Sequence, residues 1–104
     1  MIRHILLVRA RPDSTAQLLS AFEHIAGLRD RLPGLLDVTS GASKSPEQLE
    51  RGYTHGLVAD FADWESLRSY ADHAEHRAAA AQIIEVATGG NDGLLVVDLE
   101  LAGS

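Results

Sequence analysis

Five histidines in 104 residues are the most unusual feature of this sequence. Imidazole titrates near neutral pH and is the commonest acid–base side chain in proteins, so each histidine is a candidate site residue. His24 is the exception, because it follows Glu23 on the polar side of a predicted helix, where a solvated surface residue is expected. The remaining candidates are His4, His55, His73 and His76.

His73 and His76 are three residues apart, a spacing that places two side chains on one face of an unbroken helix. H-x-x-H is also a weak metal-binding pattern, but no third histidine stands here at a diagnostic spacing. We therefore predict no metal and no other cofactor. The interpretation that competes with a metal site is that both histidines belong to a polar, solvated face of the helix.

Tyr70 and Asp98 complete the candidates for acid–base chemistry. Tyr70 precedes His76 by six residues, an offset that separates their side chains on a regular helix, so they converge only if the chain bends. Asp98 lies inside the apolar run 94–101, where burial of a carboxylate is costly unless it is paired. We predict that Asp98 pairs with His76, raises the pKa of that histidine, and forms one constellation with Tyr70 at a pocket.

His4 and His55 both stand in apolar alternation on predicted strands. Each is either a core imidazole satisfied by a neighbouring group or a pocket residue, and the sequence leaves both interpretations open. Adjacent strands are expected to run antiparallel, so two positions near strand starts can lie toward opposite ends of the sheet. No contact between the two histidines is predicted.

A sheet and helices must position these side chains. Alternation with period two predicts strands over 1–10, 35–41, 53–61 and 94–101. Helical spacing predicts one helix after Ser14 that ends at Pro33-Gly34, one from Asp63 through Tyr70, and one over 78–86. The order βαββαβ is the ferredoxin-like α+β pattern, a four-stranded antiparallel sheet with helices on one face.

The second face of this sheet lacks a cover. The first predicted strand carries large apolar residues on both faces, and no remaining segment could shield the second one. An uncovered apolar sheet face should not persist in water, so we expect a homodimer formed through the sheet faces.

Length and composition exclude several classes of protein. A chain of 104 residues makes a single domain, 1–104, since cores divide only above about 250 residues. Nine Lys and Arg against fifteen Asp and Glu give a net charge of −6, which disfavours nucleic acid. The longest apolar run, 94–97, falls far short of the roughly 20 residues of a membrane helix, and no signal-peptide pattern is present. We expect a cytoplasmic protein without membrane contact.

Several segments resemble one known family. They are 2–5, Leu32-Pro33-Gly34, Gly41, Gly52-Tyr53-Thr54-His55, Phe61, and Tyr70 with His73 and His76. Across almost the whole chain they resemble the stress-responsive A/B barrel, or Dabb, family. The resemblance implies a dimeric α+β barrel with a pocket between helices and sheet in each subunit.

The resemblance leaves three functional hypotheses. Most members have no assigned reaction, so the leading one is a dimeric barrel of unknown function that binds a small organic molecule. The alternative is a cofactor-independent cyclase, lyase or isomerase, similar to the olivetolic acid cyclase-like polyketide cyclases that perform an intramolecular aldol condensation. There the acid–base pair corresponds to Tyr70 and His76, and the orienting carboxylate to Asp98. The strand histidines there correspond to His4 and His55, and we expect His4, His55 and His73 to be pocket residues. A structural dimer without a pocket is the third, which a filled interior would favour.

One position departs from the family pattern. The family often has proline directly after the first histidine of the pair, whereas this sequence has Ala74. The chain therefore has no proline to make the bend that would join Tyr70 to His76.

Overall fold

The computed structural model describes residues 1–102, and the expected domain of 1–104 runs two residues beyond that part. Its strands are β1 (Ile2–Val8), β2 (Leu35–Ala42), β3 (His55–Phe61) and β4 (Leu94–Glu100). Its helices are α1 (Thr15–Ala26), α2 (Trp64–Asp72) and α3 (Ala74–Val86), with short 3-10 helices η1 (Gly27–Asp30) and η2 (Gly90–Gly93). This order confirms the predicted βαββαβ pattern.

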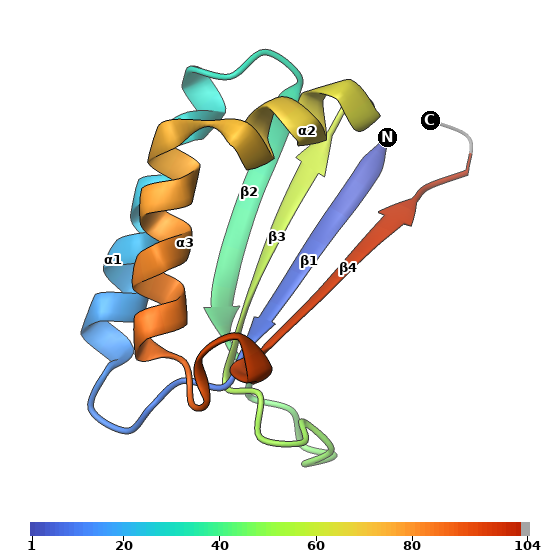
Figure 1. Cartoon of the computed structure of the whole chain (residues 1–104). Coiled ribbons are helices and arrows are strands. Elements are labelled where there is room, and N and C mark those ends of the chain that lie inside the picture. The colour runs from blue at the N-terminus through green and yellow to red at the C-terminus, as the bar shows by residue number, and fades with distance from the viewer. Residues whose placement is uncertain (103–104) are drawn as a thin grey trace.

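The four strands form one antiparallel sheet in the order β2-β3-β1-β4, with the helices on one face (Figure 1). The central strand β1 pairs with both β3 and β4. The register places His4 opposite Ala59 on one side and opposite Asp98 on the other. This is the ferredoxin-like α+β fold, and β4 is one of its two edge strands.

The core lies between the sheet and the helices α1 and α3, which lie side by side (Figure 1). Every second residue of β3, from His55 to Phe61, is buried on this face. The largest fully buried side chains are Phe22, Phe61, Ile2, Leu18, Ile25, Leu28, Leu57 and Val8. None of the helices among residues 1–102 is long and apolar enough to cross a membrane.

Several details of the elements differ from the prediction. The first α-helix ends at Ala26 and continues as η1, because Gly27 has a low helix propensity. Ser14 stands at the N-cap of α1, but its side chain makes no capping hydrogen bond. The last α-helix begins at Ala74 rather than residue 78, directly after a one-residue break at His73.

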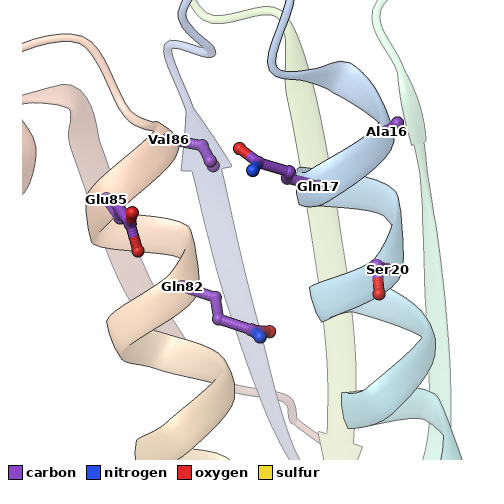
Figure 2. A pocket seen from close by; sticks show the side chains of 6 residues that line it. All are labelled: Ala16, Gln17, Ser20, Gln82, Glu85 and Val86. Carbon is purple, nitrogen blue, oxygen red and sulfur yellow. The ribbon is translucent and has the colours of Figure 1, made fainter.

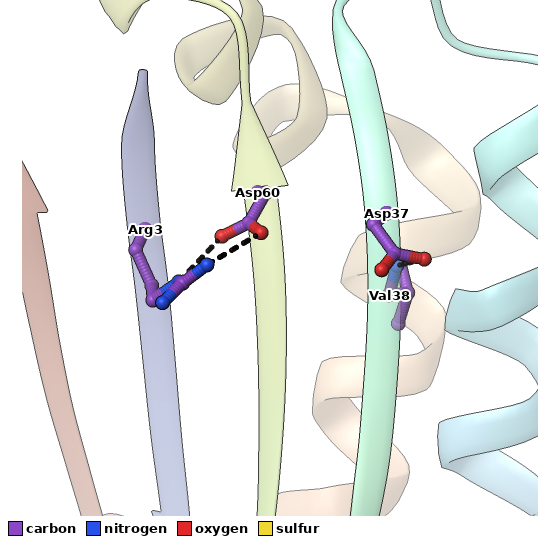
Figure 3. Close-up of polar contacts among 4 residues, drawn as sticks. All are labelled: Arg3, Asp37, Val38 and Asp60. Atoms are coloured by element: carbon purple, nitrogen blue, oxygen red, sulfur yellow. Dashed lines mark hydrogen bonds and ion pairs between the residues drawn. The ribbon is translucent and has the colours of Figure 1, made fainter. Parts of the chain in front are cut away.

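The opposite face of the sheet presents apolar side chains to solvent. Leu95, Val97 and Leu99 of β4 are each about two-fifths exposed on this face. Arg3 and Asp60 lie at one end of it, where the guanidinium donates two hydrogen bonds of 2.9 and 3.0 Å to the carboxylate (Figure 3). No element among residues 1–102 covers this surface, as the sequence predicted.

Candidate functional site

A cleft of about 170 Å³ lies between α3 and the β1–β4 side of the sheet. His4, Tyr70 and His76 contribute polar groups to its lining, and aliphatic side chains of β1, β4, α1 and α3 form the rest. Val96 and Ile84 line the cleft and are 50% and 37% exposed, so the cleft opens toward the edge strand β4. The cleft combines apolar walls with a small number of polar groups, which is typical of ligand sites.

A bend between α2 and α3 brings Tyr70 and His76 together. His73 separates the two helices and adopts an extended conformation, with φ −69° and ψ 135°. The rings of Tyr70 and His76 lie with their centroids 4.1 Å apart and their planes inclined by 43°. The two side chains therefore converge, although Ala74 stands where the family pattern often has proline.

The partner of Asp98 is His4, and the predicted bond from Asp98 to His76 is wrong. His4 Nδ1 lies 2.6 Å from Asp98 Oδ1, and because a carboxylate only accepts, Nδ1 donates. The two residues are directly opposite each other on β1 and β4. Cross-strand neighbours have Cβ atoms about 5 Å apart, so strand pairing supplies a closer histidine than the helix does.

His76 bonds to the backbone instead. Its Nδ1 lies 3.3 Å from the carbonyl oxygen of Ala71, which can only accept, so Nδ1 carries the proton. In the neutral ring the lone pair then resides on Nε2. Burial lowers the pKa of His76, and nearby His4 and His73 add to this, while the Ala71 bond opposes it. The predicted rise in the pKa of His76 is therefore also wrong.

Tyr70 stands at the centre of an aromatic cluster. Its ring centroid lies 5.0 Å from that of Phe61 and 6.0 Å from that of His4. Burial raises the pKa of the Tyr70 phenol far above its ordinary value, because an apolar surrounding disfavours the phenolate. At neutral pH Tyr70 is therefore a hydrogen-bond donor and not a base.

The remaining histidines lie outside this cleft. His73 caps α3, and His24 is half-exposed beside Glu75 at 3.4 Å. His55 pairs with Val8, four residues along β1 from His4, and its Nδ1 lies 2.8 Å from Thr54 Oγ1. It lines a separate cavity of about 530 Å³.

A third pocket, a groove of about 310 Å³, lies between α1 and α3. Figure 2 shows Gln17 of α1 and Gln82 of α3 both extending into the space between the two helices. Ala16, Ser20, Glu85 and Val86 complete its lining, and no histidine or tyrosine contributes. This groove offers hydrogen bonds but none of the acid–base groups that the sequence singled out.

The described residues supply no evident metal centre. Within residues 1–102, no group of three or more His, Asp and Glu side chains is placed to hold a metal ion. His73 and His76 in particular are tied to different partners, since His73 Nδ1 accepts from the Glu75 amide while His76 Nδ1 donates to Ala71.

We expect His76 and His55 to titrate below the ordinary histidine pKa of about 6.5. Burial lowers both pKa values, and Lys44 also lowers that of His55. Because the unfolded chain then binds these protons at a higher pH than the folded chain, the free energy of unfolding should fall as the pH decreases below about 6.5. NMR titrations of the folded chain and of the chain in urea measure both midpoints. A folded midpoint at or above the urea value would contradict the expectation.

Comparisons with known proteins identify one family model and several solved structures that are similar to this chain. A family model described as Stress responsive A/B Barrel Domain matches residues 2–101. A dimeric ferredoxin-like protein of unknown function from Jannaschia sp. CCS1 is 30% identical, with a TM-score of 0.92 over 96% of this chain and 98% of its own. One from Thermobifida fusca, also dimeric and of unknown function, is 30% identical, with a TM-score of 0.75 over 96% and 90%.

More distant structures share only the fold. The hydroxynitrile lyase of Passiflora edulis is 16% identical, with a TM-score of 0.82 over 99% of this chain and 94% of its own. No curated protein matches the sequence. The comparisons therefore identify an architecture and two dimeric relatives of unknown function, and they assign no reaction to this chain.

Proposed function

The chain belongs to the stress-responsive A/B barrel family, and on that basis we propose that it is a homodimer that binds a small organic molecule in the cleft between α3 and the sheet. The observation that carries the proposal is the cleft itself, where aliphatic walls meet His4, Tyr70 and His76. The hypothesis of a purely structural dimer would instead be favoured by a filled interior at this position.

The volume of the cleft indicates the size of the part of a ligand that it can enclose. A protein cavity of about 150 Å³ accommodates one benzene ring, and this cleft measures about 170 Å³. The walls favour an apolar body, and the imidazoles and the phenol favour one hydroxyl or carbonyl group on it. Among residues 1–102, no lysine or arginine lines the cleft, so none of these residues places a Lys or Arg side chain there for a carboxylate or phosphate.

The dimer has separate support. Two relatives that are 30% identical are dimeric, and the sheet face with Leu95, Val97 and Leu99 is exposed in the single chain. Contiguous apolar surface of this kind marks a protein interface.

Binding is tested with p-cresol, which has one ring and one hydroxyl, and with toluene, which lacks the hydroxyl. We expect p-cresol to shift the NMR signals of Tyr70, His76 and Ile83, and toluene to bind roughly two- to tenfold more weakly, the value of one hydrogen bond. Equal affinities would show that the polar groups take no part. Shifts confined to Gln17 and Gln82 would place the site in the groove between α1 and α3.

Acid–base catalysis on the bound molecule is a second candidate. The specific observation in its favour is that a neutral histidine, a protonated phenol and a histidine–carboxylate pair all belong to this one site. This is the set of groups that proton removal beside a carbonyl requires, as in an aldol-type condensation or an isomerisation. Tyr70 and His76 keep their proposed acid–base roles here, whereas Asp98 acts through His4 and not through His76.

A further inference from the structure

The bend between α2 and α3 is made by a single residue. We infer that His73 is a positioning residue, whose imidazole caps α3 and thereby fixes the angle that holds Tyr70 against His76. The inference deepens the proposed function and rests on it for its importance, because Tyr70 and His76 line the proposed binding cleft.

Three hydrogen bonds converge on His73. Its amide donates to the carbonyl of Tyr70 at 3.1 Å, and its carbonyl accepts from the amide of Arg77 at 3.0 Å. Its side-chain Nδ1 accepts from the amide of Glu75 at 3.1 Å. His73 therefore closes the last turn of α2 with its backbone and the first turn of α3 with its side chain.

Only the side-chain hydrogen bond depends on which residue stands at position 73, because the other two bonds are made by the backbone. The first amides of a helix have no partner within the helix, and an N-cap side chain satisfies one of them while its own backbone stays extended. His73 has that extended backbone, with ψ 135°. A residue without a side-chain acceptor would lose the hydrogen bond that favours this extended backbone. The chain could then continue from α2 into α3 as one helix.

A continuous helix would separate the two site residues. Positions six apart on a regular helix point in different directions, so Tyr70 and His76 could not keep their ring distance of 4.1 Å. Proline commonly imposes such a break, but residue 74 is alanine here. The imidazole of His73 performs in this chain the task that a proline ring would perform by steric exclusion.

Other contacts also hold the first turn of α3. Glu75 forms an ion pair with Arg31 and lies near His24. These contacts join α3 to α1 and to the residue after η1 but do not involve α2, so they fix where α3 lies without fixing its angle to α2. The test must therefore compare the loss of the His73 cap with the loss of an equivalent cap elsewhere.

The chain offers a matched control in Asp63. This residue is the N-cap of α2, and its Oδ1 accepts from the amide of Ser66 at 2.8 Å. We expect His73→Ala and Asp63→Ala each to lower the thermal unfolding midpoint, because each removes one helix cap. We expect only His73→Ala to abolish the NOE between the rings of Tyr70 and His76. The measurement is made at pH 8, above the ordinary histidine pKa of about 6.5.

His73→Asn is the rescue variant, because asparagine is among the best N-cap residues. It should restore both the NOE and the unfolding midpoint. An unchanged NOE in His73→Ala, an equal loss in Asp63→Ala, or a folded His73→Asn protein without the NOE would each overturn the inference. No ligand is used, so failure of p-cresol to bind would count against the proposed function and not against the role of His73.

Discussion

Val97→Asp is expected to convert the protein from a dimer to a monomer. Sedimentation at micromolar concentration should give twice the chain mass of 11.2 kDa for the unaltered protein and the single mass for the variant. Val97 lies on β4 opposite Ile5 of β1, on the sheet face turned away from the helices, and is 41% exposed in the single chain. The proposed interface would bury it.

The size of the effect follows from symmetry. A two-fold interface contains every residue twice, so one substitution introduces two carboxylates. Burial of an unpaired charge costs several kcal/mol, and each 1.4 kcal/mol weakens association tenfold. We therefore expect the dimer to be weakened by about a hundredfold or more.

Leu19→Asp is the matched control for this prediction. Leu19 is 43% exposed, close to the value for Val97, but it lies on α1 and away from the sheet. The Leu19→Asp protein should remain dimeric. If both variants stay dimeric, the interface is not the apolar sheet face, and if both dissociate, the added charge acts without regard to position.

The sequence alone was sufficient for the fold because its patterns are local. Alternation with period two revealed four strands, and Pro33-Gly34 marked the end of the first helical segment, where Gly34 adopts φ +87°. Apolar residues on both faces of β1 were sufficient to predict that one sheet face lacks a cover.

The site was only partly predictable, because its key contacts depend on strand register and on one backbone angle. The apolar surroundings of Asp98 indicated a histidine partner, but the choice between His4 and His76 depends on which residue of β1 faces Asp98. Likewise, the spacing of Tyr70 and His76 showed that a bend was needed. The ability of His73 to cap α3 without a following proline was a signal that could have predicted it.

The pairing of Asp98 with His4 leaves His76 without a carboxylate partner and changes the mechanism that a catalytic function would use. Neutral His76 carries its proton on Nδ1, so Nε2 is the atom that can remove a proton from carbon. For a ring-sized ketone such as cyclohexanone, Nε2 would take the proton from the carbon next to the carbonyl, the C–H electron pair would form a carbon–carbon double bond, and the π electrons of the carbonyl would move to its oxygen. The Tyr70 hydroxyl would donate a hydrogen bond to that oxygen.

We expect the protein in D₂O to exchange the protons of cyclohexanone next to its carbonyl for deuterium, measured by NMR, and His76→Gln to slow this exchange about a hundredfold or more, the usual contribution of a general base. Since burial lowers the pKa of His76, the exchange should persist at a pH where an ordinary histidine is already protonated. Tyr70→Phe should retain the base and lose the donor, so its rate should fall as well.

The Asp98→Asn variant distinguishes the contribution of His4 to the exchange from that of His76. Because Asp98 contacts His4 and not His76, the variant should alter the His4 signals and should not produce the fall in the His76 titration midpoint that loss of a direct bond would cause. A slower exchange in Asp98→Asn with no fall in the His76 midpoint would place His4 in the reaction beside His76. An exchange rate that is the same in the unaltered protein, in His76→Gln and in the absence of protein would eliminate catalysis of this type, and binding in the cleft would stand alone as the function.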